Sequence, residues 1–347
     1  MTLAAPRGRV YPSIWISCFI LIVIFVGLRN NVGMDWNNYL WMIQRANFGG
    51  WLQSLAVAEP GYATLLFISG KMGWGIYGAY TMGTIIFTAG LFKYARTTPY
   101  PWIALAVAFP YLITVIAMSG ARQAVAIGVL FWLFGQWYNT SLLYRAGLIL
   151  LATSFHASAI VFLLLITSDM QIRKPIRIIV FLFIVIIVGF GILRSSSFDF
   201  YQAAYISGGD SSSRVESGGA MFHVILNAGP AALAMVLGAS VKNRLLPDKL
   251  HLKLAYASLL MIPVALEAST VASRFSVYLF PVSMMIVSSF PNLSKNSDQR
   301  VLFKAMIGIF YAFVLFLWLG YATNAHAWRN YSNALFIDPS RLELCCK

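Results

Sequence analysis

Long apolar runs separated by short polar gaps recur along the whole of this 347-residue chain, and they constrain its fold more than any other feature. A helix of about 20 apolar residues crosses the hydrocarbon core of a bilayer. The runs are continuous rather than alternating, which argues against membrane-spanning strands. The candidate spans are residues 13–28, 74–92, 99–118, 122–138, 176–193, 222–240, 252–271, 274–290 and 302–321.

Composition supports the same fold class. Charged residues make up only 10% of the chain, against about 25% in soluble domains, so they are too few to coat a water-facing surface. The sequence therefore predicts an all-α polytopic membrane protein, a single membrane domain over residues 1–347 with about 10–11 transmembrane or half-membrane helices. The basic start followed by an apolar run resembles a signal peptide, but Leu28-Arg29-Asn30-Asn31 follows in place of a small-residue cleavage site, which favours a retained first span.

Two apolar stretches, 61–70 and 142–167, do not fit a straight span. The second has Ser154-Phe155-His156 at its centre, which a lipid-facing helix would avoid. Two half-length helices meeting at His156, or one long kinked helix, would each place this polar centre inside protein.

The basic residues indicate an orientation. With a cytoplasmic N-terminus and a hairpin at 142–167, 15 of the 25 Lys and Arg residues are cytoplasmic, as the positive-inside rule requires, and the C-terminus is outside. They are Arg7, Arg9, Lys93, Arg96, Arg145, Arg173, Lys174, Arg177, Lys242, Arg244, Lys249, Lys253, Lys295, Arg300 and Lys304. Most basic residues lie in gaps between spans and form no stripe on a soluble helix, which argues against nucleic-acid binding.

Two segments on the outer side are long enough to fold over that face. Residues 29–60 carry Trp36, Tyr39, Trp41 and Trp51, which suit an interfacial layer or a sugar-stacking surface. Residues 194–221 are rich in Ser and Gly and form either a lid or a disordered connector.

Ionisable groups at the outer ends of the spans are the candidate site, because such groups are costly at membrane depth without partners. Arg122 and Gln123 open an apolar helix, where a guanidinium beside the positive helix N-terminus suits phosphate oxygens; the alternative is an arginine that extends to the interface. Arg274 is either a second anion-binding arginine or the partner of Glu267, two helical turns earlier.

Three residues could move a proton. Asp35 and Glu59 are the carboxylates of the first outer segment, and either could take the proton of an attacking hydroxyl. Each could equally cap a helix, Glu59 with Pro60 in the first turn. His156 could be a base, a phosphate hydrogen-bond donor or a packing residue.

Several familiar motifs are absent. The chain has no Walker A, HExxH or GxSxG motif and no outward-facing Asp-x-Asp motif. Its three cysteines show no metal-ligand spacing. We therefore expect no metal and no cofactor. If the reaction is a glycosyl transfer, a lipid-diphosphate donor fits an outer site better than a cytoplasmic nucleotide sugar.

The succession GMDWNNY, AEPGY, SGARQAVA, SFHASAI, ASRFSVY and WRNY, from about residue 29 to 331, resembles the EpsG/Wzy-like family of bacterial polysaccharide polymerases. The resemblance implies a membrane glycosyltransferase that joins undecaprenyl-diphosphate-linked repeat units of O-antigen, capsule or exopolysaccharide at the periplasmic face of the inner membrane. It is compatible with a GT-C-like fold. Lipid-linked oligosaccharide and the bilayer are the implied partners, with a chain-length regulator and a flippase as further candidates.

Carried onto this chain, the resemblance implies roles for particular residues. Arg122 and Arg274 would hold the diphosphate or the lipid-linked glycan, while Asp35, Glu59 and His156 would position or deprotonate the acceptor hydroxyl. The remaining residues implied to line the site or bind substrate are Gln123, Tyr39, Tyr62, Tyr278 and Arg329.

Two other functions compete with this interpretation. A transporter or flippase of lipid-linked oligosaccharide would also need polar residues in its spans, but it predicts a cavity open to both sides and often an internal repeat, which the sequence does not show. A membrane acyltransferase built on His156 would favour a cytoplasmic or midplane histidine with an acidic neighbour.

Overall fold

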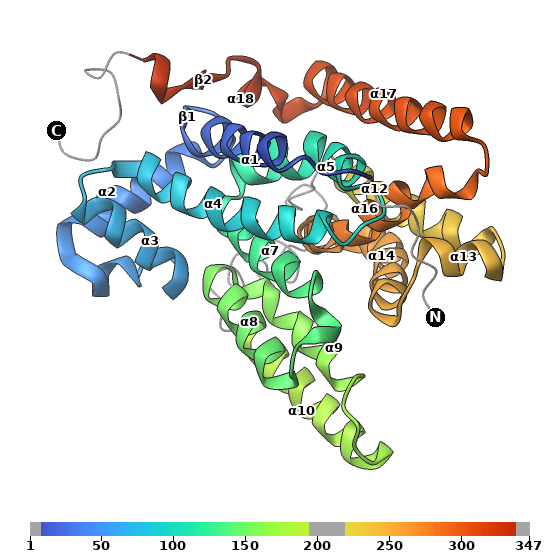
Figure 1. Ribbon diagram of the computed structural model, residues 1–347. Helices are drawn as coiled ribbons and strands as arrows, with labels where there is room; N and C mark the ends of the chain where they lie inside the picture. The colour runs from blue at the N-terminus through green and yellow to red at the C-terminus, as the bar shows by residue number, and fades with distance from the viewer. Residues whose placement is uncertain (1–7, 194–218, 338–347) are drawn as a thin grey trace.

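The computed structural model describes residues 8–193 and 219–337, which form a bundle of helices with one short two-stranded ribbon (Figure 1). Within these two ranges, five helical stretches are long and apolar enough to cross a membrane: Gly75–Ala95, Pro101–Ser119, Lys249–Glu267, Ser269–Leu293 and Ser297–Tyr321. Five shorter apolar helices accompany them: Pro12–Gly27, Ala121–Phe134, Leu142–Phe155, Ala157–Thr167 and Ala220–Val236. The predicted all-α polytopic membrane fold is confirmed.

The elements of the first half follow one another closely. They are α1 (Pro12–Gly27), β1 (Arg29–Asn30), α2 (Trp36–Ser54), α3 (Pro60–Lys71), α4 (Gly75–Ala95), α5 (Pro101–Ala108), the π-helical η1 (Phe109–Ile116), α6 (Ala117–Ser119), α7 (Ala121–Phe134), η2 (Trp137–Asn139), α8 (Leu142–Phe155), η3 (Ala157–Phe162), α9 (Leu163–Thr167) and α10 (Lys174–Leu193).

The second half begins after residues 194–218, so the predicted lid at 194–221 lies almost entirely outside the described residues. Its elements are α12 (Ala220–Val236), α13 (Ala239–Leu245), α14 (Lys249–Glu267), α15 (Ser269–Ser276), η5 (Val277–Leu279), α16 (Phe280–Ser289), η6 (Phe290–Leu293), α17 (Ser297–Tyr321), η7 (Thr323–Ala325), α18 (His326–Arg329), β2 (Ser332–Asn333) and η8 (Ala334–Phe336).

Local sequence explains where many helices begin. Proline is the first residue of α1, α3 and α5, where its missing N–H costs nothing and its fixed φ suits the first turn. Asp248 caps α14 by accepting a hydrogen bond from the backbone N–H of His251, and Asn296 caps α17 in the same way.

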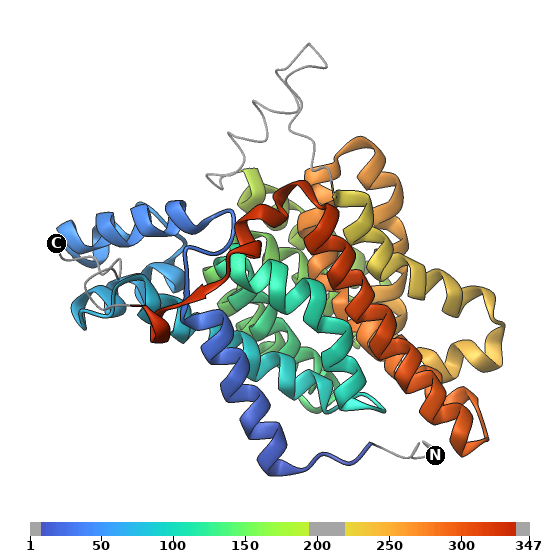
Figure 2. The ribbon, with the colours of Figure 1, turned by 90° about the horizontal axis from the view of Figure 1, so that it is seen from above.

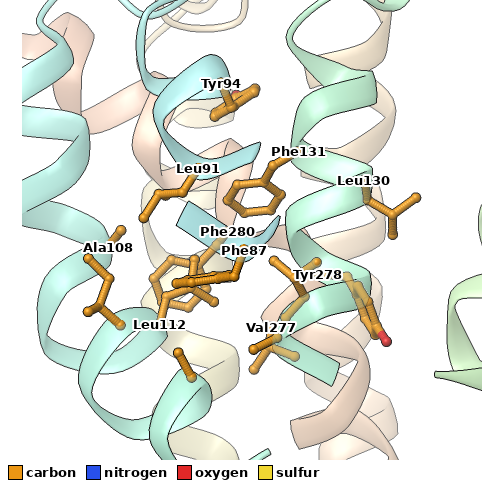
Figure 3. Packing of buried hydrophobic residues seen from close by; sticks show 14 of the residues in the cluster. Phe87, Leu91, Tyr94, Ala108, Leu112, Leu130, Phe131, Val277, Tyr278 and Phe280 are labelled. Atoms are coloured by element: carbon orange, nitrogen blue, oxygen red, sulfur yellow. The ribbon is translucent and has the colours of Figure 1, made fainter. Parts of the chain in front are cut away.

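The core lies where α4, α5, α7 and α16 meet, and Figure 3 shows Phe87 and Phe280 packed together there with Phe131 and Tyr278 nearby. The backbones of α4 and α7 touch at two glycines. A Cβ on Gly90 would lie 1.7 Å from the carbonyl oxygen of Gly128, and one on Gly128 would lie 2.4 Å from the Cα of Phe87. Small residues allow this close approach between helices in a bilayer, where packing rather than the hydrophobic effect joins them.

Residues 142–167 form a helical hairpin with His156 at its tip. His156 has extended backbone angles (φ −154°, ψ 118°) that separate α8 from η3. The two arms of the hairpin meet again at the end opposite the tip. There Asp169, which follows α9, accepts hydrogen bonds from Arg145 in α8 (2.8 Å) and from Trp137 just before α8 (2.6 Å). Of the two arrangements left open by the sequence, two half-length helices meeting at His156 is confirmed.

The segment after α17 folds back to contact the chain at the start of residues 29–60. β1 and β2 pair antiparallel, with Arg29 opposite Asn333. The N–H of Gly33 donates to Ala327, and the indole of Trp328 donates to the carbonyl of Thr114. Figure 2 shows this returning chain lying across the end of α1 and the end of the helical stretch that continues from α5 into η1. Two distant parts of the sequence therefore fix the chain just before α2.

The helix connections give the bundle two ends. The basic end holds the N-terminal segment and the turns after α4, α7, α9, α13 and α16, and it is joined by contacts such as Gly8 with Pro99, Tyr138 with Asp248, and Lys253 with Asp169. The site end holds α2, α3, the tip of the hairpin and the start of α15. Figures 1 and 2 show α2 and α3 projecting at that end.

Asp169 is the main polar anchor of the basic end, since it pairs with both Arg145 and Lys253 at 2.8 Å. Burial alone would raise the pKa of Asp169, but hydrogen bonds from Lys253 and Trp137 and the charges of Lys253 and Arg145 outweigh it and lower the pKa. A carboxyl with a lowered pKa in the fold adds stability above its ordinary pKa, and this stability is lost as the pH falls through the folded pKa.

We expect Asp169→Asn to lower the stability of the purified protein by about 1–3 kcal/mol at neutral pH, because the buried Arg145 and the partly exposed Lys253 lose their counter-charge. The difference from wild type should shrink below about pH 4. Thermal melts in detergent across pH measure both effects, with the exposed Asp298→Asn as control. Equal melting temperatures at neutral pH would contradict the anchoring role.

Candidate active site

Asp35 lies at the start of α2, held against the junction of α6 and α7. Gly33 (φ +96°) makes this approach possible, because a Cβ there would lie 2.3 Å from the carbonyl oxygen of Met118. The Ser119 hydroxyl donates to the Asp35 carboxylate at 3.3 Å. Asp35 occupies the N-cap position, but its side chain makes no capping hydrogen bond. Its carboxylate is therefore turned toward Ser119 at the end of α6 and not toward its own helix.

Burial raises the pKa of Asp35, against the lowering effects of the Ser119 hydrogen bond and of the charges on Arg274, Arg122 and Arg29. The direction of the shift is the one expected for a carboxylate that serves as a general base near neutral pH.

Arg122 joins α7 to both α2 and α3. Its guanidinium contacts the Glu59 carboxylate at 2.7 Å, and its backbone N–H donates to the Tyr39 hydroxyl at 3.0 Å. Glu59 is the N-cap residue of α3, with Pro60 next to it as expected, yet it also makes no capping hydrogen bond. The side chain of Arg122 is only 25% exposed, and its Nε is buried with no hydrogen-bond partner in the described residues. Arg122 is thus partly buried and tied to α2 and α3 by these contacts.

The hairpin tip brings His156 to the same end. His156 Nδ1 lies 2.7 Å from the Ser158 hydroxyl, which lies 2.9 Å from the hydroxyl of the fully buried Tyr278. A Cβ on Gly61 would lie 2.5 Å from Ser154 Oγ, so only glycine lets the start of α3 pack this closely on the tip. With Nδ1 engaged, Nε2 is the nitrogen that remains to meet a substrate.

Gln123 links α7 to α15 by donating to the backbone carbonyl of Arg274 at 2.6 Å. Glu267 and Arg274 do not share one helix, because α14 ends at Glu267 and the chain turns at Ala268 (φ −139°, ψ 69°). The side chain of Arg274 is exposed, and its charge acts on both Asp35 and His156. The charges of Arg274 and Arg122 therefore act on the same two groups.

Tyr39 and Tyr62 pack against each other beneath these groups, with ring centroids 5.5 Å apart. The Tyr62 hydroxyl is buried without a hydrogen-bond partner in the described residues, next to a small cavity that Tyr62 and Tyr80 help to line.

The structure also reveals Arg29, which the sequence did not single out as a site residue. Arg29 is fully buried, lies 3.7 Å over the ring of Tyr80 and donates to the carbonyls of Met118 (2.9 Å) and Val26 (2.6 Å). It supports the α6–α7 junction from below and adds a positive charge near Asp35. The sequence feature that could have identified Arg29 as a candidate is its position directly after the first apolar run.

Two further differences from the sequence-based set concern Arg329 and His223. Arg329 is not brought into the cluster: it donates to the carbonyls of Leu319 and Gly320 near the end of α17, as a basic residue at a helix C-terminus often does. His223, which had little context in sequence, lies 2.8 Å from the hydroxyl of Ser273, the residue before Arg274. Nine of the ten predicted site residues thus gather around one cluster, and Arg329 lies outside it at the same end of the bundle.

The model of the EpsG family matches residues 13–333 of this chain. The chain belongs to the EpsG family. No curated protein and no solved structure matches it, so the likeness to a GT-C fold stays a prediction. All the residues of the cluster lie within the part that the EpsG family model covers.

The cluster of this EpsG family protein brings together groups that could bind an anion and groups that could transfer a proton. Arg122, Arg274 and the N-terminus of α7 supply positive charge. Asp35 and His156 supply groups that accept or donate a proton. In the described residues no three His, Cys, Asp or Glu side chains gather as metal ligands.

Proposed function

We propose that this protein is a polysaccharide polymerase, a membrane glycosyltransferase that joins oligosaccharide repeat units carried on undecaprenyl diphosphate. Membership of the EpsG family supports a polymerase-type activity. The observation that carries the proposal is the convergence of Arg122, Arg274, Asp35 and His156 at one end of the bundle, from motifs that lie more than two hundred residues apart in sequence.

The reaction needs an acceptor hydroxyl, a base and a stabilised leaving group. The hydroxyl oxygen of an acceptor sugar attacks the anomeric carbon of the donor glycan, and its proton passes to a carboxylate. The bond between the anomeric carbon and the diphosphate oxygen breaks, and its electron pair leaves with undecaprenyl diphosphate. Arg122 and Arg274 hold the charge that develops there. The new glycosidic bond lengthens the chain by one repeat unit.

We assign the base to Asp35 and a positioning role to Glu59. The negative charge of Glu59 is paired with the guanidinium of Arg122 at 2.7 Å, so Glu59 orients the arginine. Asp35 makes no ion pair within 4 Å in the described residues, and burial raises the pKa of its carboxyl. His156 Nε2 then serves as a hydrogen-bond donor to diphosphate or sugar.

We further propose that the site end faces the periplasm and the basic end the cytoplasm. The basic clusters predicted to be cytoplasmic lie in turns of the basic end, as in Lys253 beside Asp169 and Arg96 over Trp15. The positive-inside rule then orients the bundle in the inner membrane with the N-terminus in the cytoplasm. Lipid-linked units that have crossed the membrane would meet the site there.

The test is polymerisation by the purified protein of a lipid-linked repeat unit isolated from the source cells, with products resolved by length. We expect Asp35→Asn to slow ladder formation by about 10²–10⁴-fold, since a general base contributes that much. Glu59→Gln should cost less, about tenfold, through misplacement of Arg122. In wild type the rate should fall as the pH drops through the pKa of Asp35, which lies above the ordinary value near 4.

Asp298→Asn, an exposed carboxylate at the basic end, is the matched control and should leave the ladder unchanged. Equal ladders from wild type and Asp35→Asn would overturn the assignment of the base. Movement of lipid-linked units across proteoliposomes without any ladder would favour a flippase instead.

A further inference from the structure

We propose that the kinked helix α2 carries a second glycan-binding subsite, which holds the saccharide chain beyond the reacting end. This inference rests on the proposed polymerase function and adds a binding site to it. The subsite is a cleft of about 600 Å³ lined by Trp41, Gln44, Arg45, Gln53 and Ala56, and it is called the α2 cleft below. Its volume falls in the range of roughly 300–1,000 Å³ that is typical of small-ligand sites.

A single backbone feature builds the α2 cleft. Gly50 has φ +77° and ψ −168°, angles outside the helical region, and it divides α2 into two arms. Trp41, Gln44 and Arg45 come from the first arm, while Gln53 and Ala56 follow the break. The indole of Trp51 lies 3.4 Å from the Thr64 hydroxyl on α3 and holds the second arm in place.

The α2 cleft lies on the face of α2 that is turned away from the catalytic cluster. Trp36, Tyr39, Ile43 and Ala46 are buried and form the inner face of the helix. Trp41 follows Tyr39 by two residues, which is about 200° around a helix, so it points outward. The cleft is therefore a separate surface from the one that carries Asp35 and Arg122.

The lining has the chemistry of a carbohydrate site. Trp41 is 48% exposed, and an exposed indole offers a flat apolar face for the C–H groups of a sugar ring. The Arg45 guanidinium lies 5.5 Å from the centroid of the Trp41 ring, a distance at which a cation interacts favourably with an indole. Gln44 and Gln53 each carry donors and acceptors that match hydroxyl groups.

The spacing from the reacting groups fits a growing glycan. At a rise of about 1.5 Å per residue, Trp41 lies about 9 Å and Arg45 about 15 Å along α2 from Asp35, a distance that two or three sugar residues span. A chain held in the α2 cleft would keep its end near Asp35 between additions. This retention would lengthen the product without changing the chemistry of a single addition.

A membrane headgroup is the competing occupant, because Trp and Arg also gather at bilayer interfaces. The exposed face of the first arm of α2 favours the glycan. Beside Trp41 this arm presents Asn37, Asn38, Gln44 and Arg45, and these polar groups suit water and sugar hydroxyls better than acyl chains, while the exposed Trp51 and Leu52 lie in the second arm.

The experiment compares wild type with Trp41→Ala and Gln44→Ala, using Trp74→Ala as control because Trp74 is equally exposed (48%) on the turn between α3 and α4. With the isolated lipid-linked repeat unit, we expect the initial rate of the first addition to stay within about twofold, while the mean product length falls at least threefold in Trp41→Ala. The lipid-free oligosaccharide, released from the same unit by mild acid, should bind wild type and Trp74→Ala and bind Trp41→Ala at least tenfold more weakly.

Product lengths that do not differ between Trp41→Ala and Trp74→Ala would overturn the proposal. The proposal would also be overturned if the lipid-free oligosaccharide did not bind wild type. In that outcome, the fluorescence difference between wild type and Trp41→Ala would change only on reconstitution into vesicles containing anionic lipid. A wild-type protein that makes no ladder at all contradicts the polymerase function itself. In that case, oligosaccharide binding that depends on Trp41 would still support the α2 cleft.

Discussion

If the proposed polymerase reaction is right, Arg122→Ala is expected to reduce polymerisation by about 10²–10³-fold, since it would remove a preorganised cation from the proposed position of the leaving diphosphate. Arg122 is held by Glu59 at 2.7 Å and stands in the first turn of α7, so its charge adds to the positive end of the helix. Ladder formation with isolated lipid-linked repeat units measures the loss.

Companion variants separate charge from folding. Arg122→Lys keeps the charge but loses the planar fork, so we expect it to retain part of the activity. Arg300→Ala is the matched control, because Arg300 lies at the basic end and hydrogen-bonds only to the carbonyls of Ser294 and Lys295 in the described residues. A normal ladder from Arg122→Ala, in protein that melts like wild type, would remove Arg122 from the mechanism.

Gly128→Leu is expected to abolish accumulation of folded protein. The Cβ alone would lie 2.4 Å from the Cα of Phe87 and 2.8 Å from the carbonyl oxygen of Ile86, so α4 and α7 would have to separate. These two helices form the centre of the core, and overpacking against backbone cannot be relieved by a rotamer change. The separation would also displace Arg122, which opens α7.

The readout is the yield of monodisperse protein after detergent extraction, followed by a thermal melt. Gly308→Leu serves as the matched control, because Gly308 lies on α17 with nothing within 4 Å of its added Cβ. Wild-type yield and melting temperature in Gly128→Leu would show that the contact between α4 and α7 is not required for folding.

Much of the fold follows from the sequence, because the need to satisfy every backbone hydrogen bond in a bilayer turns each long apolar run into a helix. The predicted spans at 74–92 and 302–321 match α4 and α17, and the break at His156 in the stretch 142–167 is present. The polar motifs at span ends were also visible as candidates, since ionisable groups at membrane depth need partners.

Helix contacts in the tertiary structure decided which of these groups meet. Apolar runs do not encode a crossing point, so nothing in sequence showed that Gly33 and Gly61 admit the approach that brings Asp35 to Ser119 and Glu59 to the hairpin tip. Arg29 looked like a residue flanking the first span, and it is a fully buried support for the α6–α7 junction. Arg329, part of a sequence motif, caps α17 because the returning chain after that helix turns it away from the cluster. The sequence by itself determined the helices and the polar residues at their ends, while the packing of α2, α3, α7, the hairpin and α15 determined which of those residues form one site.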